Sequence, residues 1–288
     1  MDEKVLVRVR EESTRILLNG YNNNIYSASC LAFSGYGGAY FSDCFNGVGR
    51  YGQDDSEKVN QKTIFDLASL TKPIVTLPAV LQLLERGKIS WNEPLSSLLE
   101  KPVANGLERV DLRLLLSHSA GFCAHRDYWK ELIHMEAKHR QKWILENIMS
   151  EQLAYEPGSR HLYSDLGYIL LGFIIEKKTG LSLDDFWRRH IARPSGLEKM
   201  LFFGNEIPRE EQHRIVSTGW CTWSGEPLIG RVHDDNCRAL GGVAGHAGLF
   251  GSAEGLLKMC KLFVDLYHGR SRDTPFSTDT FRRACRPA

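Results

Sequence analysis

The chain has 288 residues, a formal net charge of +1 at pH 7, 42% hydrophobic residues and 25% charged residues. This composition is typical of a globular soluble protein, and the near-zero net charge gives no support for binding to nucleic acid. No apolar run approaches the length that a membrane span needs, so the sequence predicts no membrane span.

The cysteines and the N-terminus bear on the compartment. The seven cysteines are dispersed and no pair has C-x-x-C spacing, which favours reduced thiols in a cytosolic protein over zinc or redox motifs. A disulfide between Cys30 and Cys44, on neighbouring predicted strands, is the alternative. The segment Met1–Val5 is charged and lacks an apolar signal core, so we expect a cytoplasmic location.

The first part of the chain predicts a helix and then a hairpin. Apolar residues at helical spacing predict an amphipathic helix over 2–19, stopped by Gly20. Residues 26–34 and 39–46 predict two strands joined by a glycine-rich turn, and the polar residues 48–62 predict a loop.

The rest of the chain predicts mainly helices. A helix is expected from Ser69 to Arg86, with a kink or an end to its first part at Pro78. The nearly all-round apolar pattern of 164–178 predicts a buried helix. The remaining expectations are helices over 111–118, 139–152, 183–191 and 253–267, irregular structure over 202–245, and a polar tail without a clear strand. A strand hairpin followed by many helices predicts one α+β domain over 1–288, with a helical subregion at about 75–200.

The spacing of Ser69 and Lys72 is the strongest chemical signal. Residues three apart share a helix face, so the Lys72 amine can reach the Ser69 hydroxyl. A serine hydroxyl becomes a good nucleophile when a neighbouring base takes its proton, and a neutral lysine can be that base. The non-catalytic alternative is a serine that caps the helix N-terminus, followed by a surface lysine.

Tyr163-Ser164-Asp165 precedes the predicted buried helix. The structural reading is that Ser164 or Asp165 caps this helix while Tyr163 packs nearby. The functional reading places Tyr163 at the exposed lip of a rigid helix, where a phenol is well placed for proton transfer.

Several separated blocks occur in one order and together resemble a known family. They are Ser69-Leu70-Thr71-Lys72, Leu114-Leu115-Leu116-Ser117-His118-Ser119-Ala120-Gly121, Pro157-Gly158 and Tyr163-Ser164-Asp165-Leu166-Gly167-Tyr168. The pattern resembles the serine β-lactamase and penicillin-binding protein superfamily, in the class C β-lactamase-related branch, over about residues 25–268. The resemblance implies an antiparallel sheet flanked by helices plus an all-helical region. Because relatives often act at the cell envelope, a periplasmic or envelope-associated location is the alternative to a cytoplasmic one.

The resemblance also implies roles for individual residues. Ser69 would be the acylated nucleophile, Lys72 its base, and Tyr163 a proton relay to the leaving group. Asp165 stands where the family often has asparagine as a substrate contact. A carboxylate beside Lys72 favours the charged amine and opposes its role as a base, although it would suit a substrate with a cationic group. No cofactor is implied.

The third family motif, usually Lys-Thr-Gly or His-x-Gly on a strand beside the nucleophile, is not evident. His246-Ala247-Gly248 is a candidate, with His246 and Gly248 as substrate-binding residues, but a helix is predicted directly after it. We therefore expect the third motif to be missing and the chain to end before its C-terminal strands. The segment 26–46 would then be an isolated hairpin, which is marginal in water, unless a homo-oligomer or another partner completes the sheet.

Two further groups admit two readings each. His233, Asp234, Asp235 and His246 have side chains that suit zinc, but their spacing matches no standard signature, so we expect a hydrogen-bonded loop and no metal. Trp220 and Trp223 would line a substrate cleft or, as we expect, pack onto the core.

The sequence therefore favours a serine hydrolase acting through a Ser69 acyl-enzyme on small esters, D-amino-acid peptides or β-lactam-like amides. The alternative is a catalytically impaired, truncated module that binds a ligand or regulates another protein. The substrate pocket comes from loops, so nothing in the sequence chooses among these substrates.

Overall fold

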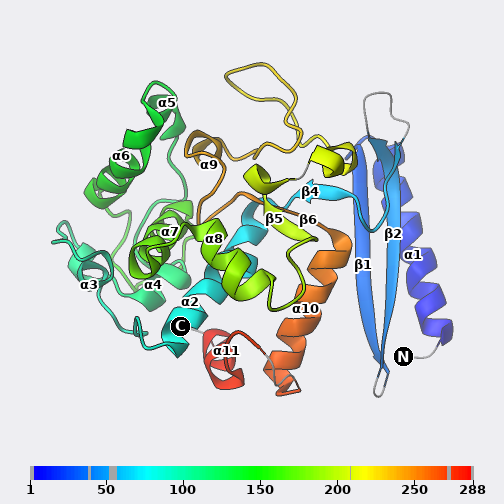
Figure 1. The fold of residues 1–288 in the computed structure, drawn as a ribbon, viewed down its shortest axis with the longest axis horizontal. Helices are drawn as coiled ribbons and strands as arrows, with labels where there is room; N and C mark the ends of the chain where they lie inside the picture. The colour runs from blue at the N-terminus through cyan, green and yellow to red at the C-terminus, as the bar shows by residue number, and fades with distance from the viewer. Residues whose placement is uncertain (1–2, 38–39, 52–56, 208, 271–273, 287–288) are drawn as a thin grey trace.

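A computed structural model describes residues 3–37, 40–51, 57–207, 209–270 and 274–286. A helix and a β hairpin from the N-terminal part lie at one end of the molecule, and a larger body of helices surrounds a short sheet at the other (Figure 1). The helices are α1 (Glu3–Asn22), α2 (Leu77–Glu85), α3 (Leu95–Leu99), α4 (Leu112–Leu116), α5 (Trp129–Leu132), α6 (Ala137–Ser150), α7 (Asp165–Thr179), α8 (Leu183–Trp187), α9 (Asp235–Ala239), α10 (Ala253–His268) and α11 (Thr278–Ala284). This order confirms the α+β fold class.

The described strands form two three-stranded antiparallel sheets. The first has the order β1 (Ala28–Gly37), β2 (Tyr40–Tyr51) and β3 (Glu57–Lys58). The second has the order β4 (Ile64–Asp66), β6 (Leu249–Ser252) and β5 (Leu201–Phe203). Pairing β4 with β6 brings the segment before Ser69 against a segment about 180 residues later, so the sheet organises the site.

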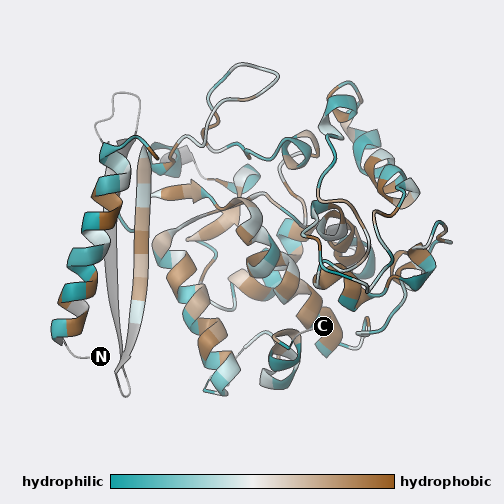
Figure 2. Ribbon diagram, turned by 180° about the vertical axis from the view of Figure 1, so that it is seen from behind, coloured by the Kyte–Doolittle hydropathy of each residue, from teal (hydrophilic) through white to brown (hydrophobic). Residues whose placement is uncertain are grey.

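The hairpin is not isolated, which corrects the sequence-based expectation. Helix α1 packs against β2, and α10 packs against β1. Both views show the hairpin held between these two helices (Figures 1 and 2). The hairpin therefore has a helix beside each of its two long strands. A partner chain that completes the sheet stays a prediction.

The register of the hairpin also bears on the disulfide alternative. Cys30 lies opposite Gly47, and Cys44 lies opposite Phe33, so the two cysteines do not face each other across the strands. The Cys30 thiol is free. The register offsets the two residues by three positions, and the disulfide reading is therefore wrong.

The helix that carries the predicted nucleophile has three parts. A 3₁₀ turn over Ala68–Leu70 leads into a π-helical turn over Lys72–Thr76 and then into α2. The chain changes helix type just before Pro78 and does not break there. Proline has no N–H to offer the carbonyl of Ile74, four residues earlier. The indole nitrogen of Trp187 donates to that oxygen instead, at 3.0 Å.

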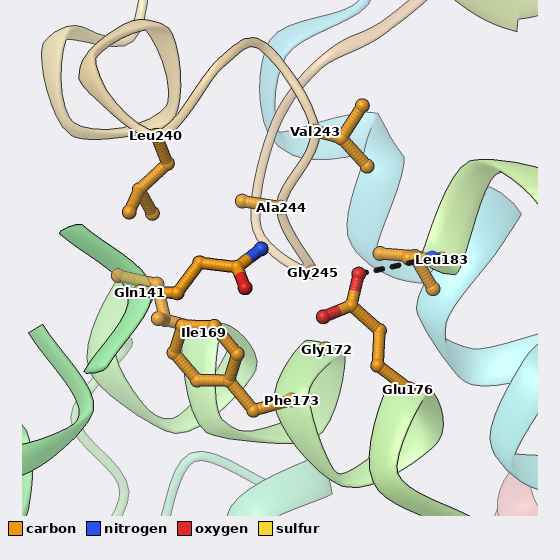
Figure 3. Close-up of a pocket in the computed structure, with 10 residues that line it drawn as sticks. All are labelled: Gln141, Ile169, Gly172, Phe173, Glu176, Leu183, Leu240, Val243, Ala244 and Gly245. Carbon is orange, nitrogen blue, oxygen red and sulfur yellow. Dashed lines mark hydrogen bonds between the residues drawn. The ribbon is translucent and has the colours of Figure 1, made fainter. Parts of the chain in front are cut away.

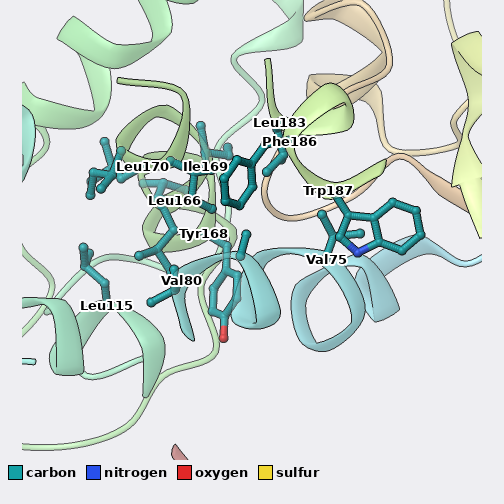
Figure 4. Packing of buried hydrophobic residues seen from close by; sticks show 14 of the residues in the cluster. Val75, Val80, Leu115, Leu166, Tyr168, Ile169, Leu170, Leu183, Phe186 and Trp187 are labelled. Atoms are coloured by element: carbon teal, nitrogen blue, oxygen red, sulfur yellow. The ribbon is translucent and has the colours of Figure 1, made fainter. Parts of the chain in front are cut away.

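Helix α7 lies in the main hydrophobic core, as its all-round apolar pattern predicts. Its residues pack with side chains from α2, α4 and α8 (Figure 4). Gly180 ends the helix in the left-handed conformation, with φ +71°. This buried helix gives a rigid base to Asp165, its first residue.

The sequence missed the shortest elements. Strand β2 runs into the predicted loop 48–62, which also contains β3. Strand β4 lies just after that loop, and the region expected to be irregular contains α9. The polar tail contains α11. Strands of two to four residues are too short to show a period, and their neighbours come from distant parts of the chain. Among the described residues, no helix is both long and apolar enough to cross a membrane.

Candidate active site

Ser69 sits on the turn between β4 and the helix. The backbone N–H of Leu67 donates to Leu249 O at 2.9 Å, which ties this turn to β6. Asp66 Oδ1 accepts the N–H of Ala68 at 2.8 Å, and Ala68 adopts φ +45°, which an L-residue rarely does. Ser69 is exposed. The turn therefore presents its hydroxyl at the surface.

Lys72 lies beneath Ser69 and its side chain is 3% exposed. Its Nζ contacts three oxygens: Ser69 Oγ at 2.9 Å, Asp165 Oδ1 at 2.8 Å and the backbone oxygen of His246 at 3.1 Å. The spacing of Ser69 and Lys72 predicts their contact, and the structure shows it. The fold brings Asp165 to the same amine.

The three contacts define what each protonation state of Lys72 can do. An ammonium has three N–H groups and would donate to all three oxygens. A neutral amine has two N–H groups and one lone pair. If the two N–H groups go to Asp165 and to the His246 carbonyl, the lone pair faces the Ser69 hydroxyl. This arrangement suits a base for Ser69.

Both carboxylate oxygens of Asp165 are engaged. Oδ1 accepts from Lys72, and Oδ2 lies 3.1 Å from Nδ1 of His125. Burial alone would raise the pKa of this carboxyl. The nearby His246 ring, the Lys72 amine and the hydrogen bonds from Lys72 and His125 outweigh burial, so the pKa lies below its usual range. Asp165 is therefore ionised at neutral pH, with both oxygens facing protein groups. Its predicted role as a substrate contact stays a prediction.

Tyr163 lies at the lip of the site. Its side chain is 52% exposed, and Lys72 Nζ lies 4.8 Å from its ring centroid. The ring of His118 packs between Tyr163, at 4.5 Å, and Tyr168, at 4.9 Å. Nδ1 of His118 accepts the Ser164 N–H at 3.1 Å, so its proton is on Nε2. Desolvation, followed by the Lys72 charge, lowers the pKa of His118.

His246 and Gly248 lie below the nucleophile and are buried. The His246 ring is 1% exposed, and its Nε2 lies 2.9 Å from Asp234 Oδ1. Gly248 has φ +118° and packs against Gly242. Both residues are buried, so neither presents a surface to a substrate in this structure. Their predicted substrate-binding role remains a prediction, whereas the His246 carbonyl directly holds Lys72.

Sequence reasoning missed His118, His125 and Tyr168 as parts of the site. His118 and Tyr168 lie inside the motif blocks that carried the resemblance, which is the signal that could have found them. No sequence signal marks His125, because its contact with Asp165 spans 40 positions and depends on the fold.

The remaining candidate groups have structural partners. Asp234 caps α9 by accepting the Cys237 N–H at 2.8 Å, and Asp235 accepts from Thr222 Oγ1 at 3.0 Å. The ring of Trp223 stacks on Trp129 at 5.3 Å, whereas Trp220 is 69% exposed. The packing expectation is therefore confirmed for Trp223 and wrong for Trp220.

A small cavity lies against the segment just before His246. Its walls include Gln141, Glu176 and Gly245 (Figure 3). Its volume of about 10 Å³ is close to that of a single water site. One oxygen of Glu176 accepts the Leu183 N–H at 3.1 Å, and the Gln141 amide points into the same space. Because of its size, it is not a substrate site.

The fold and site define an α+β protein with an exposed serine over a buried lysine. A family model described as Beta-lactamase matches residues 33–283. The chain belongs to this family, and its neighbours among solved structures include class C β-lactamases and penicillin-binding proteins.

Individual relatives agree with this membership. A putative D-alanyl-D-alanine carboxypeptidase of Salmonella paratyphi B is 31% identical over 226 residues, which cover 72% of this chain and 52% of that protein. The chain thus spans about half the length of the curated relatives it matches. The octameric penicillin-binding protein homologue from Pyrococcus abyssi has a TM-score of 0.70 at 21% identity, covering 93% of this chain and 58% of that one. A β-lactamase/D-alanine carboxypeptidase from Pseudomonas syringae has a TM-score of 0.71 at 17% identity, covering 96% and 69%.

Proposed function

We propose that this chain is a serine hydrolase that forms an acyl-enzyme on Ser69 with small esters, D-amino-acid peptides or β-lactam-like amides. The observation that carries the proposal is the contact of 2.9 Å between the exposed Ser69 hydroxyl and the buried Lys72 amine. Membership of the Beta-lactamase family supports it.

In the first step, neutral Lys72 takes the Ser69 proton while Ser69 Oγ attacks the substrate carbonyl carbon. The carbonyl electron pair moves onto oxygen, and the Ser69 N–H at the start of the helix donates to this oxyanion. The intermediate collapses when the bond to the leaving group breaks. That group receives the proton from Lys72 through the Tyr163 phenol, which leaves an ester on Ser69.

In the second step, water attacks the ester carbonyl. The same groups act in reverse: Tyr163 and Lys72 accept a proton from the water, and Lys72 returns it to Ser69 Oγ as the acid leaves. Asp165 and the His246 carbonyl hold the amine in place through both steps.

The test is intact-mass spectrometry after exposure to a fluorophosphonate and, separately, to a penicillin. We expect a single adduct on the wild type, no adduct on Ser69→Ala, and almost none on Lys72→Ala. Ser119→Ala is the matched control. It removes a serine hydroxyl that contacts a different basic side chain, with Ser119 Oγ lying 2.6 Å from His161 Nδ1. This control should label as the wild type does.

An unlabelled but folded wild type would favour the alternative of a catalytically impaired binding or regulatory module. Labelling of the Lys72→Ala variant at the wild-type rate would instead remove Lys72 from the mechanism.

A further inference from the structure

The carboxylate of Asp165 is shared by two basic side chains. Lys72 Nζ lies 2.8 Å from Oδ1, and His125 Nδ1 lies 3.1 Å from Oδ2. The Asp165 side chain is 16% exposed, so these contacts are shielded from water on most sides. The chain Ser69–Lys72–Asp165–His125 therefore connects the nucleophile to the rim of the site.

His125 is oriented by its surroundings. Its side chain is 42% exposed, and Nε2 lies 3.5 Å from Asp127 Oδ1. The other carboxylate oxygen of Asp127, Oδ2, pairs with Lys130 Nζ at 2.7 Å. Because Asp165 is ionised, its oxygen is an acceptor, and Nδ1 of His125 must be the donor in their hydrogen bond. The donor is present whether the ring is neutral or charged.

The hydrogen bond from His125 to Asp165 affects how strongly Asp165 holds the proton of Lys72. An ionised Asp165 stabilises the ammonium form of Lys72 and so holds back the proton transfer that activates Ser69. A hydrogen bond to the other carboxylate oxygen draws electron density away from Oδ1, which weakens the hold of Asp165 on the Lys72 proton.

We propose that His125 is a positioning residue that orients Asp165 and weakens its hold on the Lys72 proton, so that Lys72 can act as a base in the presence of a carboxylate. The inference rests on the proposed function and deepens it. It assigns Asp165 and His125 to the proton balance of the base and not to substrate recognition.

Other charged or titratable groups also face this network. Tyr163, Tyr168 and His118 lie near Lys72. Lys72 also contacts the backbone carbonyl of His246, whose ring pairs with Asp234. Asp127 and Asp234 face His125. All of these groups stay in the variants of His125. Because His125→Asn keeps a donor near Nδ1 and His125→Gln does not, a difference between these two variants reports the contact with Asp165.

The experiment measures the rate of Ser69 labelling by a fluorophosphonate from pH 5 to pH 10 in matched variants. His125→Asn places an amide N–H close to the position of Nδ1, whereas His125→Gln places its amide near Nε2 and cannot donate to Asp165 in the same way. We expect His125→Gln and His125→Ala to raise the pH midpoint of labelling by about 1 unit, which is a loss of about tenfold at neutral pH. His125→Asn should stay within about 0.3 unit of the wild type.

A double substitution separates positioning from a general structural effect. Asp165→Asn removes the carboxylate and should lower the midpoint. Adding His125→Gln to Asp165→Asn should then change nothing further, because the group through which His125 acts is gone.

Equal midpoints for His125→Gln, His125→Asn and wild type would overturn the inference, as would an equal shift by His125→Gln with and without Asp165. Circular dichroism checks that each variant is folded, and the exposure of His125 favours retention of the fold. A wild type that is unlabelled at every pH would reject the proposed function itself, which is a different result from a labelled wild type with unchanged variants.

Discussion

Gly172 on α7 and Gly245 on the loop before β6 touch through their backbones. A Cβ atom on Gly172 would lie 2.9 Å from the nitrogen of Gly245, closer than real Cβ atoms approach other atoms. The contact allows the loop to pass against α7. The next residue along, His246, can then offer its carbonyl to Lys72.

Gly172→Ala should therefore destabilise the fold by about 1–3 kcal/mol, because backbone must move to admit the methyl group. Gly167→Ala is the matched control on the same helix, where the nearest atom would be an ordinary 3.6 Å away. It should be neutral or stabilising by about 0.5–1 kcal/mol, since alanine favours helices. Urea unfolding measures both. Equal stability of the two variants would contradict the role of this contact.

The indole of Trp187 compensates for Pro78 by donating to Ile74 O. Trp187→Phe should lose about 1–3 kcal/mol of unfolding free energy, because the buried carbonyl loses its donor. Pro78→Ala restores a backbone N–H near that oxygen, so the double variant should lose less than the sum of the two single variants. Additive losses in thermal or urea unfolding would show that the two groups are independent.

Asp234 links the loop, α9 and His246. Burial would raise its pKa, but the His246 ring and the Cys237 N–H outweigh burial and hold the pKa far below its usual range. A lowered pKa in the folded state stabilises the fold above the unfolded value of about 3.9, and this stabilisation is lost as the pH falls below it.

Asp234→Asn should therefore be less stable than wild type at pH 7, by about 3 kcal/mol, with the difference shrinking below pH of about 4. Asparagine can still cap α9, so the helix end is preserved. Urea unfolding at pH 7 and pH 3 checks this. A difference that stays constant with pH would exclude the charge of Asp234 as its cause.

The pKa of Glu176 is shifted in the opposite direction to that of Asp234. Burial raises its pKa, and the nearby Asp184 adds to this, against the hydrogen bond from Leu183. Its stabilising effect is present below the unfolded value of about 4.3 and is lost as the pH rises through the folded value, so the ionised group is a cost at pH 7.

Glu176→Gln keeps an acceptor for the Leu183 N–H and removes the charge, so it should raise the unfolding free energy at pH 7 by about 1 kcal/mol. The gain should vanish near pH 4. Glu156→Gln, at a side chain that is 67% exposed, is the control and should change stability little. The melting temperatures at the two pH values measure the effect, and a loss of stability in Glu176→Gln at pH 7 would contradict it.

Much of this protein was predictable from local sequence. The motif blocks identified the family, the spacing of Ser69 and Lys72 predicted their contact, and the all-round apolar pattern of 164–178 predicted the buried helix. These signals are local, because helix periodicity and short spacings act within a few turns of the chain.

Only the tertiary structure decided how Asp165 is used. Its partners Lys72 and His125 lie 93 and 40 positions away, and the His246 carbonyl lies 174 positions from Lys72. No local pattern encodes such contacts, because they arise when buried apolar faces bring distant segments together. For the same reason the sequence missed that α1 and α10 cover the hairpin, since packing between elements determines which faces are buried.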